Sequence, residues 1–214
     1  NGFLNIRIKG QSAHGSTPEA GVNAGFILIE FLSTMELDDN AMNFLDFANK
    51  YIVGNYKGEQ FDMAHTHEDM GEVSVNTGMI NYTEVDGASF GVNLRYPEGL
   101  DFNSGIHALK SRILNEGFTI EDLSDEPPHY VNPEDPLVKV LLDSYRNHVD
   151  DDTEPFTIGG GTYARTLERG VAFGAMFNET EDTMHQKNET MQIDELLKAT
   201  AIYLEAIYRI CVEG

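Results

Sequence analysis

The spacing of apolar residues divides the first part of the chain into helices and strands. Apolar positions recur at helical spacing over residues 22–35, 41–53 and 103–115. Strand-like runs occur at residues 4–9, 72–77, 79–85, 88–96 and 118–123. Asp86-Gly87 is a strong hairpin signal between two of these runs. The order predicts helices over one face of an antiparallel sheet, a ferredoxin-like α+β domain.

A second region, with a different spacing of apolar residues, begins after the segment Ser124–Pro128, whose two prolines indicate a boundary. Its pattern predicts, in order, a helix over residues 136–148, a strand at 155–158, a glycine turn, a helix ending at Glu168, a strand at 171–176 and a long amphipathic final helix. This alternation is typical of the edge of a larger α/β domain. We therefore predict two parts, residues 1–125 and residues 126–214.

Composition narrows the classes of function. The 214 residues carry 14 Lys and Arg against 36 Asp and Glu, a formal net charge of -22. Such an acidic chain repels phosphate backbones and anionic lipid, which argues against nucleic-acid and membrane partners. The single cysteine, Cys211, excludes an internal disulfide and a cysteine-based zinc site, and it fits a reducing, cytoplasmic compartment. The strand-like pattern starts directly after Asn1, so we expect a piece of a longer protein.

Two polar residues of the first region are candidates for chemistry. His14 lies among small residues in the loop Gly10–Pro18, where a ligand can approach its imidazole. The ring could donate a hydrogen bond to an oxygen or act as an acid or base, although a histidine that caps its own loop fits the same pattern. Arg95 ends a predicted strand, and its guanidinium could bind a carboxylate or an oxyanion. A surface salt bridge is the alternative for Arg95.

The second region contributes two further candidates. The glycines of Ile158–Arg165 stand at a predicted strand-to-helix turn, where backbone N–H groups can approach an anion. A tight turn without a ligand is the alternative. His185 lies in a predicted loop between a strand and the last helix, with acidic neighbours that favour a cation. An exposed loop histidine without a ligand is the alternative there.

Taken together, four motifs in order resemble the metallopeptidase family of aminoacylase, acetylornithine deacetylase, succinyl-diaminopimelate desuccinylase and carnosinase. The branch they are most similar to is the bacterial peptidase V type of dipeptidase, and the resemblance covers the whole chain. The motifs are Gly10–Ser16 with Gly21, Asn23 and Ala24; Asn93-x-Arg95-Tyr96-Pro97; Gly159–Arg165; and His185 with Asn188 and Glu189.

The resemblance implies a function and a role for each motif. It implies two zinc ions that activate a water for hydrolysis of a dipeptide. His185 would be one zinc ligand. His14, on the part of a lid domain formed by residues 1–125, whose N-terminal part would be missing, would stabilise the oxyanion, and Arg95 would bind the substrate or the transition state. The remaining substrate contacts would come from Gly159, Gly160, Gly161, Thr162 and Arg165.

The resemblance also implies that most of the active site lies outside this chain. The family's other metal ligands and its general base belong to an N-terminal half, which would be the main partner of residues 126–214. A single histidine cannot hold two zinc ions, so the isolated chain is expected to be inactive.

Two other interpretations remain open at this point. A deacylase of the same family would share the chemistry and differ in substrate. A ferredoxin-like module with a regulatory or dimerisation role would need none of the four motifs.

Overall fold

The computed structural model describes residues 4–174, 176–181, 183 and 187–213. The chain forms two compact units, an N-terminal unit of residues 1–128 and a C-terminal unit of residues 129–214. The division falls just after the two prolines that mark the predicted boundary. Each unit is described by itself.

Three α-helices of the N-terminal unit begin at residues with capping side chains. The carboxylate of Asp38 accepts hydrogen bonds from the N–H groups of Asn40 and Ala41, both at 3.1 Å. Such caps satisfy the unpaired donors of the first helical turn. The helices are α1 (Ala24–Leu32, capped by Asn23), α2 (Asp39–Tyr51, capped by Asp38) and α3 (Phe102–Leu114, capped by Asp101). All three predicted helices are confirmed: the first is shorter than predicted, and the other two begin and end one or two residues earlier. Two short 3-10 helices, η1 (Pro18–Ala20) and η2 (Glu59–Phe61), lie in the loops.

The strands form two small antiparallel sheets. β3 (Ser74–Thr83) and β4 (Gly87–Arg95) make a long hairpin, and β1 (Thr66–His67) pairs with β2 (Gly71–Glu72). An irregularity between Thr77 and Met79 lets β3 continue through Gly78, so the predicted strands at 72–77 and 79–85 are one element.

The predicted ferredoxin-like sheet is not confirmed, and the unit is a mixed α/β structure. Residues 4–9 and 118–123 form no strand, although Phe118 and Ile120 pack against the core. Alternating apolar residues indicate which side chains are buried, whereas a strand also requires a neighbouring backbone to pair with. Among the described residues, the segment at 118–123 satisfies only the first condition, and the segment at 4–9 satisfies neither, because Leu4 and Ile6 are exposed.

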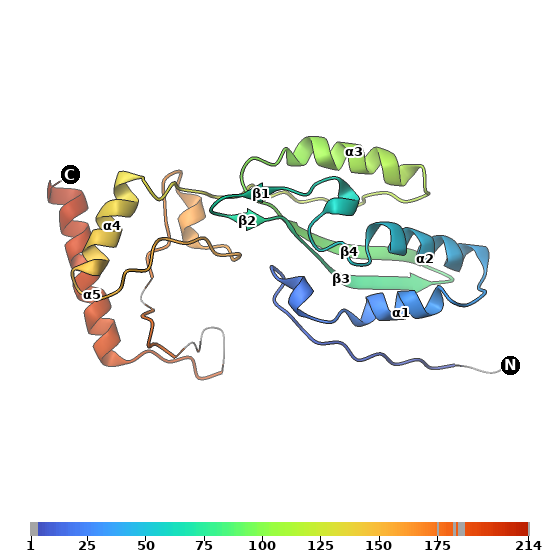
Figure 1. Cartoon of the computed structure of the whole chain (residues 1–214), viewed down its shortest axis with the longest axis horizontal. Coiled ribbons are helices and arrows are strands. Elements are labelled where there is room, and N and C mark those ends of the chain that lie inside the picture. The colour runs from blue at the N-terminus through green and yellow to red at the C-terminus, as the bar shows by residue number, and fades with distance from the viewer. Residues whose placement is uncertain (1–3, 175, 182, 184–186, 214) are drawn as a thin grey trace. The chain divides into compact units, whose positions relative to one another are not determined.

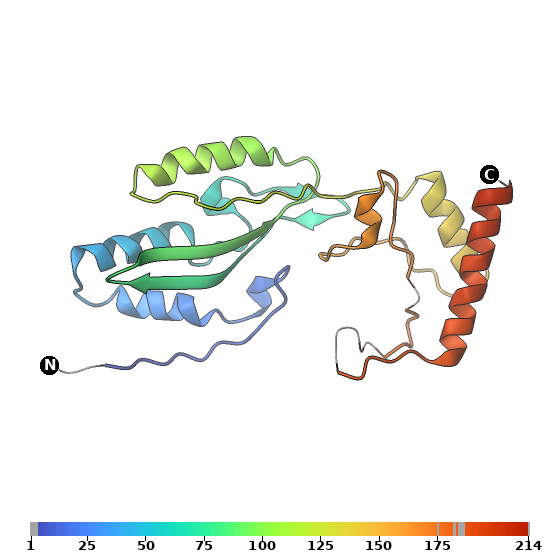
Figure 2. The ribbon, with the colours of Figure 1, turned by 180° about the vertical axis from the view of Figure 1, so that it is seen from behind.

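The core lies on one face of the β3–β4 hairpin, against which the three helices pack (Figure 1). Phe90 of β4 stacks on Phe44 and Phe47 of α2, with ring centroids 5.1 and 5.7 Å apart. Figure 2 shows the hairpin from behind. Asn81 and Ser89, which are opposed in the β3–β4 register, are exposed on the surface away from the core. We call this second surface the open face.

The C-terminal unit is built around two helices, α4 (Pro136–Arg146) and α5 (Ile193–Tyr208), which bury Val138, Ala199 and Ile202. A π-helical turn, η4 (Arg209–Glu213), follows α5, and a 3-10 helix, η3 (Tyr163–Thr166), lies in the central loop. The strands predicted at 155–158 and 171–176 are wrong for the described positions, because no strand of this unit is available there for pairing. None of the described helices is long and apolar enough to cross a bilayer.

A carboxylate links α4 to the loops of this unit. Asp151 accepts hydrogen bonds from Tyr145 at 2.7 Å, from the hydroxyl and N–H of Thr153 at 2.6 and 2.9 Å, and from Asn178 at 3.1 Å. Donors to the charged form favour ionisation. The hydrogen bonds from Thr153, with the one from Tyr145, lower the pKa of Asp151 to about 2 from 3.8.

This pKa predicts an acid-sensitive contribution to the stability of the unit. A depressed pKa in the folded state stabilises the fold above the unfolded-state value and ceases to do so as the pH falls through the folded value. Asp151→Asn should therefore unfold at lower urea than the wild type at pH 7, and the difference should shrink between about pH 4 and about pH 2. Circular dichroism in urea at several pH values measures it. A constant difference across that range would contradict the assignment.

Candidate active site

A closed loop carries His14 in the N-terminal unit. Its two ends are joined by a backbone bridge, in which Gln11 N–H donates to Val22 O at 3.0 Å and Val22 N–H donates to Gln11 O at 2.9 Å. The bridge requires glycine on both sides: a Cβ on Gly10 would lie 2.3 Å from Val22 O, and one on Gly21 would lie 2.6 Å from Gln11 O. The two glycines of the sequence motif thus fix the position of the loop.

The hydrogen bonds of His14 determine which ring nitrogen is exposed as a donor. Ser16 Oγ lies 2.7 Å from His14 Nδ1, and the N–H of Ser16 donates to the same nitrogen at 3.3 Å. A ring nitrogen that accepts from a backbone N–H carries no proton, so the network assigns the proton of the neutral ring to Nε2. No described residue bonds to Nε2, and the residue is exposed. His14 can therefore offer an N–H to an oxygen outside the loop.

Arg95 lies at the same loop. It is the last residue of β4, and its Nε donates to Asn93 Oδ1 at 3.1 Å. A Cβ placed on Gly15 would lie 3.5 Å from Arg95 Nη2 and 3.6 Å from Asn76 Nδ2. The structure thus places Gly15, the neighbour of His14, beside Arg95 at one end of the open face.

Asn76 and Asn93 lie near Arg95, and neither was predicted as a site residue, although Asn93 is part of the sequence motif that contains Arg95. They are directly opposed in the β3–β4 register, on the same face as Arg95. The signal available in the sequence was the two-residue spacing of Asn93 and Arg95, which places both side chains on one face of a strand. Nothing local in the sequence connects Asn76 to either of them.

The glycine turn lies in the C-terminal unit and differs from the prediction. Gly159 and Gly160 form a bend, and the following helix is η3, four residues long, rather than an α-helix ending at Glu168. So short a helix has almost no macrodipole, and the predicted anion site at a helix N-terminus loses that physical basis. Arg165 lies over the turn, with Nη1 3.3 Å from where a Cβ of Gly161 would stand. Thr162 precedes η3 and makes no capping hydrogen bond with its side chain.

The sequence comparisons decide the family. Residues 13–209 match the family described as peptidase family M20/M25/M40. The chain belongs to this family. Proteins named "putative dipeptidase" from Staphylococcus saprophyticus and Staphylococcus aureus USA300 are 48% and 47% identical to it over 213 residues. The match covers 100% of this chain and 45% of each relative, so the chain spans less than half the length of these relatives.

The predicted metal ligand of this M20 chain, His185, lies outside the described residues. Within the part that is described, no group of three or more His, Cys, Asp or Glu side chains is placed to hold a metal ion. Two further histidines, His65 and His67, lie close together in the sequence but make contacts within the protein. His65 Nε2 lies 3.2 Å from Glu98 O, and His67 Nδ1 accepts two N–H groups of its own turn.

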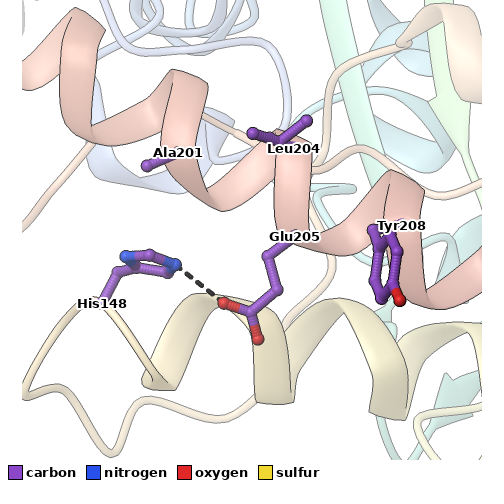
Figure 3. A pocket seen from close by; sticks show the side chains of 5 residues that line it. All are labelled: His148, Ala201, Leu204, Glu205 and Tyr208. Atoms are coloured by element: carbon purple, nitrogen blue, oxygen red, sulfur yellow. Dashed lines mark hydrogen bonds and ion pairs between the residues drawn. The ribbon is translucent and has the colours of Figure 1, made fainter.

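A shallow hollow of about 470 Å³ lies between the end of α4 and α5 of this M20 chain (Figure 3). His148 Nε2 and Glu205 Oε2 lie within hydrogen-bond distance in it, at 2.8 Å, and Ala201, Leu204 and Tyr208 supply an apolar wall. Its polar groups are paired with each other, and none of the predicted site residues lines it.

Proposed function

We propose that the full-length protein is a zinc-dependent dipeptidase and that this chain supplies its lid and the end of its catalytic domain. In this proposal His14 donates a hydrogen bond to the oxygen of the scissile carbonyl, and Arg95 binds the substrate. The family match and the names of the relatives support hydrolysis of peptides. Contacts of the substrate with Gly159–Gly161, Thr162 and Arg165, and zinc binding by His185, stay predictions.

The geometry of His14 is the observation that carries the proposal. Both hydrogen bonds to Nδ1 come from Ser16, in the same loop, and they leave the Nε2–H without a partner among the described residues. When a nucleophile attacks a carbonyl, negative charge develops on the oxygen, and a preorganised N–H donor stabilises that charge.

Zinc is the part of the proposal to which the described residues contribute least. They hold no cluster of metal-binding side chains, so nearly all ligands would come from the rest of the full-length protein. The residues of this chain would bind and orient the substrate and donate the hydrogen bond to its carbonyl oxygen.

The exposed apolar surface of the C-terminal unit supports a role as part of a larger domain. Phe156 and Tyr163 expose 77% and 95% of their surface, although both are large aromatic residues. Soluble proteins rarely leave contiguous apolar patches of this kind uncovered. Exposed apolar residues also cover α5 and η4: Ile193, Leu196, Leu197, Leu204, Ile207, Tyr208, Ile210 and Val212. We propose that the N-terminal half of the same protein covers this surface.

Activity assays test the proposal directly. The full-length protein should hydrolyse unblocked dipeptides, lose turnover when a chelator removes the metal, and regain it with zinc. The 214-residue chain should show no turnover at any zinc concentration, because the described residues hold no group of metal ligands and the family's other ligands are expected in the rest of the full-length protein. Turnover by the metal-free full-length protein, or by the chain alone, would refute this division of roles.

A substrate panel separates the dipeptidase from a deacylase of the same family. N-acetylated amino acids contain the same amide bond but no free amino terminus. A higher kcat/KM for these substrates than for dipeptides would assign the protein to the deacylases.

A further inference from the structure

An ion pair joins the bridged loop that carries His14 to the segment that follows α2. Lys57 Nζ donates to Glu19 Oε1 at 2.8 Å. Glu19 belongs to η1, which lies inside the bridged loop. It is the only Asp, Glu, Lys or Arg among residues 11–22. The loop therefore has one permanently charged side chain, and that side chain is paired with Lys57.

Backbone hydrogen bonds connect the turn of Glu19 to His14. The C=O of His14 accepts from the N–H of Thr17 at 2.9 Å, and the C=O of Thr17 accepts from the N–H of Ala20 at 3.1 Å. His14 and Glu19 are thus parts of two consecutive hydrogen-bonded turns. A displacement of Glu19 therefore also displaces the backbone of His14.

Lys57 lies on a fixed segment of backbone. The carbonyl groups on both sides of it accept hydrogen bonds: Tyr56 O from the N–H of Val75 at 2.8 Å, and Gly58 O from the N–H of Met63 at 3.0 Å. Val75 and Met63 are both buried in the core. Because the Lys57 backbone is held by core residues, its ion pair ties the loop to the core of the N-terminal unit.

Of the two carboxylates near Lys57, Glu19 is the stronger partner. Glu72 of β2 lies farther from Lys57 Nζ, at 3.3 Å, and its side chain is more exposed than that of Glu19. The hydrogen bond with Glu19 is the main cause that raises the pKa of Lys57, and the same bond is the main cause that lowers the pKa of Glu19. Both partners are therefore charged at neutral pH, and Glu72 provides a control carboxylate.

We propose that Lys57 is a positioning residue, which holds the His14 loop in place through Glu19. The inference rests on the proposed function, because the N–H of His14 affects the rate only if it meets the carbonyl oxygen of a substrate. It adds two residues that act through the loop rather than on the substrate. A donor contributes to catalysis only while the residues around it keep it in position.

Removing either member of the pair should lower kcat by the same amount. A partly exposed ion pair corresponds to an effect of at most about fivefold. We expect Lys57→Met and Glu19→Gln each to lower kcat by about threefold to fivefold and to change KM less than about twofold. The variant Lys57→Met/Glu19→Gln should lose no more than either alone, because both substitutions delete one contact. Glu72→Gln, the matched control, should keep kcat within about 1.5-fold of the wild type.

Exchanging the charges separates a positioning role from a merely structural one. Lys57→Glu places a third carboxylate beside Glu19 and Glu72, so it should lower kcat further than Lys57→Met does. Lys57→Glu/Glu19→Lys restores opposite charges across the same contact and should return kcat to within about twofold of the wild type. A lysine needed only for the packing of its side chain would not be rescued by this exchange.

Amide hydrogen exchange in the full-length protein measures the anchor without an assay of hydrolysis. In Lys57→Met and Glu19→Gln, the bonded N–H groups of Thr17 and Ala20 should exchange about threefold to fivefold faster than in the wild type. Glu72→Gln should exchange like the wild type, and all variants should keep thermal unfolding midpoints close to it.

Three results would overturn the proposal: unchanged exchange in the loop, additive losses of kcat in the variant that lacks both partners, or no recovery of kcat after the charges are exchanged. If the full-length protein hydrolyses no dipeptide, the proposed function fails by itself. Faster loop exchange confined to the Lys57 and Glu19 variants would then still support the anchor, and unchanged exchange would refute it as well.

Discussion

Replacing His14 by alanine in the full-length protein should lower kcat by about 10²–10³ and change KM far less. The reason is that the Nε2–H would meet negative charge on the carbonyl oxygen chiefly in the transition state. An interaction made only there affects kcat rather than substrate binding. Ser16→Ala should cause a smaller loss, since the backbone N–H of Ser16 still bonds to Nδ1 at 3.3 Å. Steady-state kinetics with dipeptides measures both.

His67 provides a matched control for this substitution. Its Nδ1 also accepts two backbone N–H groups, from Asp69 at 3.1 Å and Met70 at 3.3 Å. His67→Ala removes a loop histidine with the same kind of hydrogen bonds, at a position outside the loop Gly10–Pro18. Its kcat should stay within about twofold of the wild type. A His14→Ala effect confined to KM would make His14 a ground-state binding residue and contradict the oxyanion role.

The helices were predictable because their signals are local. Asp38 and Asp101 stand directly before an apolar pattern of helical period, and each caps the helix that follows. The strands were less predictable because pairing depends on residues far apart in the sequence. Phe118 and Ile120 follow a strand pattern and are packed on the core, yet their backbone does not pair with a strand among the described residues.

In the candidate site, too, features that depend on neighbouring residues could be predicted, whereas features that depend on residues far apart in the sequence could not. The glycines around His14 indicated a tight loop, and the structure explains two of them by close approach to the opposite backbone. Asn76 could not be predicted, because an asparagine in the middle of a strand has no local pattern that marks it. Only the register of β3 against β4, and the fold of the loop onto the hairpin, bring it beside Arg95.

Breaking the backbone bridge between Gln11 and Val22 should lower kcat, because the bridge fixes the position of the His14 loop. Gly10→Ala places a methyl group 2.3 Å from Val22 O and 3.1 Å from Ala24 N, both backbone atoms that cannot rotate away. The chain must shift, and the paired bonds between Gln11 and Val22 must lengthen or break. Since His14 lies inside the bridged loop, its donor loses its fixed position. A donor that is no longer preorganised contributes little, so kcat should fall by about 10²-fold, approaching the loss in His14→Ala.

Gln11→Ala is the control for the bridge. Both bridging bonds use the backbone N–H and C=O of Gln11, and its exposed side chain makes no hydrogen bond with the described residues. This variant should therefore keep near wild-type kcat, whereas Gly21→Ala, whose methyl would lie 2.6 Å from Gln11 O, should behave like Gly10→Ala. In the double variant Gly10→Ala/His14→Ala the two losses in kcat should not add. Gly10→Ala already displaces the His14 donor, so removing its side chain as well has little further effect. Additive losses in kcat would show that the bridge supports the enzyme by some route other than His14.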